Sequence, residues 1–161
     1  MNTTETDMAR FSELVKALVP EAEIHEGKQF AEITVPPASL LAAAEALKEN
    51  PDTRCDYLIN LTGVDYGTEL GVIYHLGSSK HGQIIVLKTK TPERANPVLE
   101  SVCGIWRTAE FHEREAYDLL GIRFSNHPDL RRLFLDDTWG FPLRKDYVDD
   151  TNTAANGEDR E

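Results

Sequence analysis

Three short stretches near the end of the chain carry most of its information: EREAYDLLGI at residues 113–122, HPDLRR at residues 127–132 and PLRKDY at residues 142–147. Between residues 111 and 147 there are six Lys or Arg and seven Asp or Glu, and five of the six cations are Arg. A guanidinium binds a carboxylate through two parallel hydrogen bonds and tolerates partial burial better than an ammonium does. We therefore expect organised ion pairs at a contact surface here, rather than a freely solvated loop.

The composition is that of one ordinary globular domain. A chain of 161 residues, of which 40% are hydrophobic and 28% charged, is long enough to bury a core of its own. Its formal net charge of −11 repels phosphates and so disfavours a nucleic-acid partner. We see no signal or transit peptide, and no apolar run approaches the roughly 18 residues that span a bilayer, so we expect any membrane association to come through partner proteins.

Cofactor motifs are missing from the sequence. There is no dinucleotide-binding fingerprint and no P-loop, and Cys55 and Cys103 are too few for the four thiolates that an iron–sulfur cluster usually takes. We therefore expect the chain to hold no cofactor of its own.

The hydrophobic pattern predicts an α+β fold. Apolar spacing and capping residues predict helices at residues 8–18, 39–49, 97–103 and 109–120. Alternating patterns between turn residues predict strands at residues 22–25, 30–35, 57–65, 70–76 and 83–88. This order favours a two-layer sandwich, in which one mixed, mostly antiparallel five-stranded sheet has helices on one face.

Regular periodicity ends after Ile122, which suggests three parts. Residues 1–122 are expected to form the α+β domain. Residues 123–148, the C-terminal segment, are expected to be an extended, irregular docking segment, because Pro128 and Pro142 force extended backbone before them. The acidic residues 149–161 are expected to be a disordered tail.

A catalytic or metal site is weighed against a structural role and rejected. His112, Glu113 and His127 suggest a hydrolase, but zinc ligands on a helix lie about one turn apart, and His127 lies beyond the predicted helix. Glu110 and Asp118, each four residues from Arg114, instead predict a row of ion pairs along one helix face. We therefore expect no catalytic, cofactor-binding or metal-binding residue.

A docking surface is the better interpretation, because aromatic residues and Arg dominate protein interfaces. Its expected residues are Glu113, Arg114, Glu115, His127, Asp129, Arg131, Arg132, Trp139, Arg144, Lys145, Asp146 and Tyr147.

The three quoted motifs, in this order and near this spacing, resemble the C subunit, or thirty-kilodalton subunit, of proton-pumping NADH:quinone oxidoreductase, respiratory complex I. The resemblance is strong from Ala109 to Tyr147 and weak before it. Two departures concern local packing: Phe111 stands where a Trp is expected, and Trp139 lies one residue closer to Pro142 than is usual.

The resemblance implies a cofactor-free structural subunit of the peripheral arm. It would dock on the D subunit, whose cavity with the B subunit forms the quinone site, and its C-terminal segment would run along the D subunit. Partner subunits would hold FMN and the iron–sulfur clusters that carry electrons from NADH to quinone, coupled to proton translocation. The chain would then be part of an enzyme, peripheral to the cytoplasmic face of a bacterial inner membrane. The alternative is the equivalent subunit of a membrane-bound hydrogenase or of a ferredoxin-fed quinone reductase.

Overall fold

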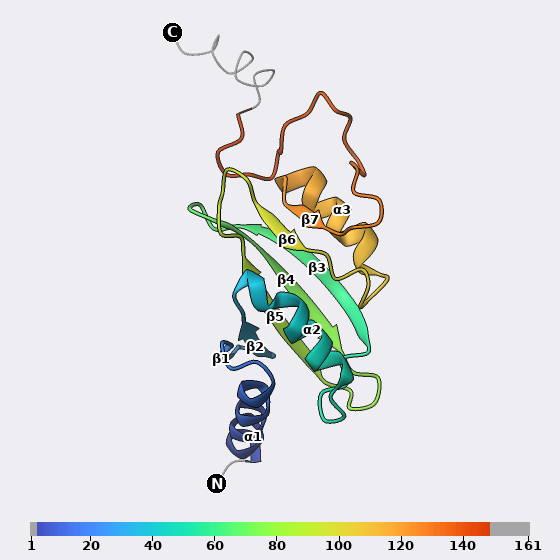
Figure 1. Cartoon of the computed structure of the whole chain (residues 1–161). Coiled ribbons are helices and arrows are strands. Elements are labelled where there is room, and N and C mark those ends of the chain that lie inside the picture. The colour runs from blue at the N-terminus through green and yellow to red at the C-terminus, as the bar shows by residue number, and fades with distance from the viewer. Residues whose placement is uncertain (1–2, 149–161) are drawn as a thin grey trace.

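One sheet with helices packed against it forms the body of the protein (Figure 1). The computed structural model describes residues 3–148, so the tail expected at residues 149–161 lies outside the described residues. The helices are α1 (Thr3–Leu18), the short 3-10 helix η1 (Pro37–Ser39), α2 (Leu40–Glu49) and α3 (Ala109–Leu120). The strands are β1 (Glu23–Glu26), β2 (Ala31–Thr34), β3 (Tyr57–Asp65), β4 (Leu70–Gly77), β5 (Ile84–Lys90), β6 (Val98–Glu100) and β7 (Arg123–Ser125).

The larger sheet is mixed and mostly antiparallel. Its strands lie in the order β1-β2-β5-β4-β3, and of its four neighbouring pairs only β2 and β5 are parallel. Strands β6 and β7 form a separate parallel pair. The predicted α+β fold with one mixed five-stranded sheet is therefore confirmed.

The core lies between one face of the sheet and helices α2 and α3. Leu61, Tyr74 and Leu87 face one another across β3, β4 and β5, and none is more than 2% exposed. Helix α2 adds four buried side chains at helical spacing, which are Leu40, Ala43, Ala44 and Leu47.

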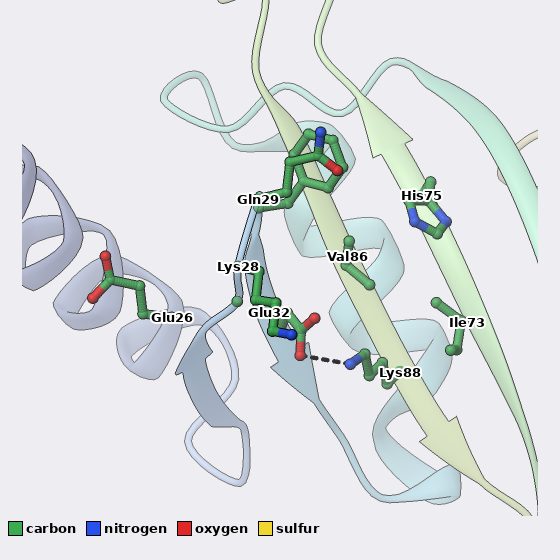
Figure 2. Close-up of a pocket in the computed structure, with 10 residues that line it drawn as sticks. Glu26, Lys28, Gln29, Glu32, Ile73, His75, Val86 and Lys88 are labelled. Carbon is green, nitrogen blue, oxygen red and sulfur yellow. Dashed lines mark hydrogen bonds and ion pairs between the residues drawn. The ribbon is translucent and has the colours of Figure 1, made fainter.

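The opposite face of the sheet is partly polar. Ile73, His75 and Val86 stand there beside the ion pair of Lys88 and Glu32, whose Nζ and Oε2 atoms are 2.5 Å apart (Figure 2). These side chains help to line a shallow, open hollow of about 520 Å³. Antiparallel sheets commonly leave one face to solvent, and the two charges here neutralise each other. The hollow therefore points to no particular ligand.

Helix α3 packs closely on β3 because Gly63 has no side chain. A Cβ atom at Gly63 would lie 2.6 Å from Leu120 Cδ1 and 3.3 Å from Ala116 Cβ. The helix then ends at Gly121, whose φ of 73° is left-handed and favours glycine. Together these two glycines position the end of α3, where the C-terminal segment begins.

Two predicted elements differ from the structure. The helix predicted at residues 97–103 is wrong: β6 occupies part of that range and pairs in parallel with β7, a strand that no periodicity in the sequence indicated. A pairing partner more than 20 residues away overrides local helical propensity here. Helix α1 begins at Thr3, so Asp7 lies inside the helix and not at its N-cap.

We expect Gly63→Ala to lower the free energy of unfolding by about 1–3 kcal/mol, because the added methyl group would overlap Leu120 on α3. Urea denaturation measures the change. Gly104→Ala is the control, since no atom lies within 4 Å of a Cβ at that position. Equal stability of the two variants would contradict the close approach of α3 to β3.

Candidate functional site

The C-terminal segment runs from β7 over helix α3, and one buried carboxylate of the helix holds it there (Figure 1). Asp118 is 0% exposed. Its Oδ2 atom accepts three consecutive backbone N–H groups, from Leu133 (3.1 Å), Phe134 (2.6 Å) and Leu135 (3.1 Å). Its Oδ1 atom accepts a fourth bond, from Arg132 Nη1 at 2.9 Å. Such a concave run of backbone N–H groups is a typical anion-binding arrangement.

These bonds keep Asp118 ionised. Burial acts to raise the pKa of its carboxyl group, but the N–H groups of Phe134 and Leu135 and the guanidinium of Arg132 outweigh burial and hold the pKa below its usual value. The segment therefore encloses a negative charge that it also satisfies.

The C-terminal end of α3 is satisfied by the same segment. The last four carbonyl groups of a helix lack partners within the helix. Here each of them accepts a hydrogen bond, and three of the four donors come from the C-terminal segment. The bonds run from Gly121 N to Tyr117 O (2.8 Å), from Arg132 Nη1 to Asp118 O (3.1 Å), from Leu143 N to Leu119 O (3.1 Å) and from Arg144 Nε to Leu120 O (2.6 Å).

Arg114 reaches from the helix in the other direction. It is 4% exposed, and its Nε and Nη2 atoms donate to the carbonyl oxygens of Arg131 and Arg132 at 3.1 and 3.0 Å. The predicted row of ion pairs from Glu110 to Asp118 is therefore wrong for this part of the structure. Arg114 and Asp118 bind the C-terminal segment instead of each other.

A second set of charges fastens the far end of the segment to the sheet. Arg94 binds both carboxylate oxygens of Asp65, at 2.7 and 2.9 Å, and one oxygen of Asp146, at 2.7 Å. The backbone N–H of Lys145 also donates to Asp65, at 2.8 Å. The Arg94 guanidinium holds the pKa of Asp65 well below its usual range against the effect of burial. The segment is thus attached at both ends.

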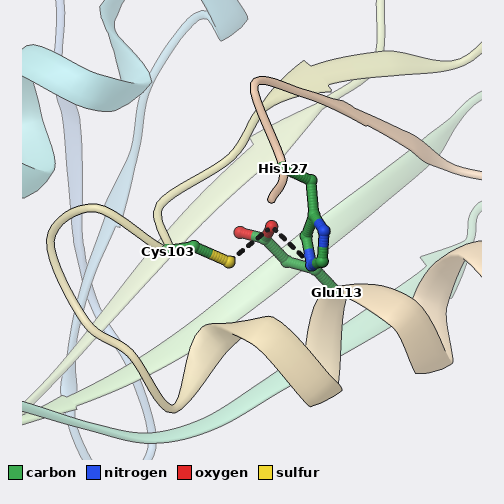
Figure 3. Close-up of side chains that lie close together, drawn as sticks. All are labelled: Cys103, Glu113 and His127. Atoms are coloured by element: carbon green, nitrogen blue, oxygen red, sulfur yellow. Dashed lines mark hydrogen bonds and ion pairs between the residues drawn. The ribbon is translucent and has the colours of Figure 1, made fainter. Parts of the chain in front are cut away.

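Cys103, Glu113 and His127 meet beneath the start of the segment (Figure 3). The fully buried Glu113 accepts hydrogen bonds from Ser101 Oγ (2.6 Å), Val102 N (2.8 Å) and Cys103 Sγ (3.3 Å). Burial raises the pKa of Glu113, although the bonds from Ser101 and Val102 oppose this. The carboxyl group joins the loop before α3 to the helix.

The donor atoms of these three residues lie within 4.8 Å of one another, which is compatible in distance with a metal ion. His127 argues against one. Its Nδ1 accepts the N–H of Asp129 and its Nε2 donates to Glu110 O, both at 3.0 Å, so the ring is neutral with its hydrogen on Nε2. Metal binding at Nε2 would move that hydrogen to Nδ1, where it would meet the Asp129 N–H. We therefore assign the cluster a structural role.

Large apolar side chains gather on α3 and the C-terminal segment with more than 40% of their surface exposed. They are Phe111, Phe134, Trp139, Leu143 and Val148. The sequence analysis had named only Trp139 among them. Exposed apolar groups on a backbone held by buried charges form a preorganised contact surface, which we call the docking surface.

The structure separates the expected docking residues into two groups. Glu113, Arg114, His127 and Arg132 lie inside the protein and position the segment, as described above. Arg131 and Asp129 form an exposed ion pair at 2.8 Å, and Glu115 is exposed. Of the remaining four, Arg144 and Tyr147 are half-buried, whereas Lys145 and Asp146 are exposed at the end attached to the sheet.

Sequence reasoning missed Asp65, Arg94 and the true partners of Asp118. These residues meet only through the fold, so no spacing along the chain could have indicated them.

Residues 33–153 match a sequence model of the family described as respiratory-chain NADH dehydrogenase, 30 Kd subunit. The chain belongs to this family. It is 38% identical over 146 residues to the NADH-quinone oxidoreductase C subunit of Roseiflexus sp. strain RS-1, a match that covers 87% of this chain and 83% of that protein. It is also 53% identical over 110 residues to the NADH-quinone oxidoreductase C/D subunit of Phocaeicola vulgatus, covering 67% of this chain but only 21% of the relative. The chain thus spans about a fifth of this longer relative.

Two solved structures share the fold of this thirty-kilodalton family member. A trypsin-resistant fragment of Nqo5 superposes with a TM-score of 0.62 at 27% identity, covering 76% of this chain and 98% of the fragment. A chain of the archaeal membrane-bound sulfane sulfur reductase superposes with a TM-score of 0.76 at 22% identity, covering 95% and 92%. In the part of the chain that the structure describes, no helix combines the length and apolarity needed to cross a membrane.

We expect Asp118→Asn to lower the free energy of unfolding by about 3–5 kcal/mol, because removal of one charge from a buried pair leaves Arg132 and three N–H groups poorly satisfied. Chemical denaturation measures the loss, and limited proteolysis should show earlier cleavage in residues 126–148. Asp129→Asn is the control, since its ion pair is exposed and should matter little. Similar stability of the two variants would show that Asp118 does not hold the segment.

The contribution of Asp118 to stability should depend on pH in one direction. Because its folded pKa is lowered, the contribution is complete above the ordinary pKa of about 3.9 and is lost as the pH falls through the lower folded value. The difference in free energy of unfolding between wild type and Asp118→Asn should be constant near neutral pH and shrink in acid below about pH 4. A difference that grows on acidification would contradict an ionised Asp118.

Proposed function

We propose that this chain is a structural subunit of the peripheral arm of an NADH-quinone oxidoreductase, complex I, and docks there on the D subunit. The observation that carries the proposal is the docking surface. Buried charges fix the path of the C-terminal segment, while Phe134, Trp139 and Leu143 remain exposed on it. A surface ordered before binding loses little conformational entropy when a partner covers it.

The D subunit is the favoured partner because relatives of this chain carry the letters C and D in one name. The B subunit would lie nearby, with the quinone site between it and the D subunit. Electrons from NADH would pass to quinone through FMN and iron–sulfur clusters held by other subunits, coupled to proton translocation. The chain would be peripheral, on the cytoplasmic face of a bacterial inner membrane, and would reach the membrane through its partners.

The chain's own groups support a role in assembly. Burial raises the pKa of both Cys55 and Cys103 to about 12, so their thiols stay protonated at neutral pH and are poor nucleophiles and poor metal ligands. The charged residues at the centre of α3 spend their hydrogen bonds on the C-terminal segment. These features fit a subunit that supports electron transfer without cofactors or catalytic residues of its own.

The same fold occurs in a chain of an archaeal respiratory membrane complex, so the fold does not choose between electron-transfer machines. A membrane-bound hydrogenase or a ferredoxin-fed quinone reductase is the second candidate. The subunits that accompany the chain distinguish them. Affinity purification of the tagged chain from native membranes should recover the D subunit together with FMN- and cluster-binding subunits. Recovery of a nickel-binding large subunit would favour the hydrogenase, and recovery of no partner would contradict a docking role.

We expect Phe134→Asp and Leu143→Asp each to reduce the amount of assembled complex at least tenfold, since each buries a charge at a contact made by an exposed apolar side chain. Native gels of membranes and co-purification measure assembly. Ile59→Asp is the matched control, because Ile59 is also exposed but lies on β3, outside the docking surface. Normal assembly of the first two variants, or an equal defect in the third, would count against this surface.

A further inference from the structure

A small cavity of about 210 Å³ opens at the C-terminal end of α3. Three separate parts of the chain line it: the loop before β6 with Asn96, the end of α3 with Tyr117, and Arg123 and Arg144 on either side of the C-terminal segment's path. Two guanidinium groups therefore face one cavity that is large enough for a single side chain.

Arg144 is a half-buried cation with unused hydrogen-bonding capacity. Its Nε atom donates to Leu120 O, and its guanidinium lies over the ring of Phe141 at 4.8 Å. Among residues 3–148, no carboxylate oxygen lies within 4.0 Å of it, because the acids nearby, Asp65 and Asp146, are paired with Arg94. Burial, and after it the charge of Arg94, lowers the pKa of Arg144. An extra negative charge at this place would therefore be favourable.

Arg123 adds a second positive charge to the cavity. Its side chain is exposed, and in the described part of the chain it forms no ion pair. Only its backbone is committed, since its N–H donates to Pro97 O at 2.8 Å. Within residues 3–148 the protein thus keeps two cations unpaired beside each other, although its net charge is strongly negative.

The end of α3 carries partial negative charge, which opposes an anion here. Its effect is limited because all four terminal carbonyls already accept hydrogen bonds, one of them from Arg144 itself. Two full positive charges outweigh what remains.

We infer that this cavity binds a carboxylate side chain of the partner on which the chain docks. A guanidinium fork matches the two oxygens of a carboxylate, with the Arg144 group facing the cavity, Arg123 beside it, and Asn96 and Tyr117 as further donors. The cavity lies next to exposed Leu143, so it extends the docking surface and supplies it with a charge-specific contact. This inference rests on the proposed function and names the chemistry of the partner residue.

Four full-length variants test the carboxylate site: Arg144→Ala, Arg144→Lys, Arg123→Ala and, as control, Arg131→Ala. Tagged chain is titrated into membranes from cells that lack it, and bound chain is measured. We expect about 10- to 30-fold weaker association for Arg144→Ala. Arg144→Lys should lose less because it keeps the charge but not the planar fork. Arg131 already pairs with Asp129, so its variant should bind like wild type.

Arg123→Ala separates recognition from folding, because no hydrogen bond within the described residues uses the Arg123 side chain. It should retain wild-type stability in urea and still bind about tenfold more weakly. Raising the salt concentration should weaken wild type more than the double variant Arg123→Ala/Arg144→Ala, since exposed charge pairs are screened. Wild-type binding by both single variants would overturn the carboxylate site.

The acidic residues 149–161 of the chain itself are the competing source of a carboxylate. A full-length variant with its five acids in that stretch changed to amides distinguishes the sources. If the tail filled the cavity, this variant would remove the difference between wild type and Arg123→Ala, and the partner assignment would be wrong. An unchanged difference supports the partner. Failure of the wild-type chain to bind any membrane would instead contradict the proposed function.

Discussion

A carboxylate buried at the end of a helix must be satisfied by hydrogen bonds, and in this protein that requirement fixes the path of the C-terminal segment. Asp118 sits where solvent cannot reach it, and the segment curls so that three successive backbone N–H groups and Arg132 converge on it. Without this contact the helix would carry an unpaired charge in its packed face, a cost of several kcal/mol. The position of every docking residue beyond Leu135 follows from this bend.

The segment is held mainly by polar contacts, since few of its apolar side chains are buried. It donates to carbonyl groups at the end of α3, accepts from Arg114 and closes on Asp65 through Lys145. Backbone groups that find partners in the domain leave the apolar side chains free to face outward. Chain order and surface chemistry are thus supplied by different atoms of the same residues.

The sequence predicted what local patterns encode. Alternation marked all five strands of the larger sheet, and Gly121 marked the end of α3. The parallel pair of β6 and β7 was missed because each strand has three residues and gains its partner only through the fold. The same holds for charges: helical spacing suggested that Arg114 and Asp118 pair with each other, yet both find stronger partners on a segment that no periodicity could place.

The parallel pair also has a consequence for synthesis on the ribosome. β6, α3 and β7 form one crossover unit, and the groups that complete the end of α3 are translated after the helix itself. A nascent chain that has reached Ile122 holds a helix with bare terminal carbonyls and an uncompensated Asp118. Such an end unwinds easily and is open to proteases. The helix is therefore finished, and protected from cleavage, only after Arg144 has left the ribosome.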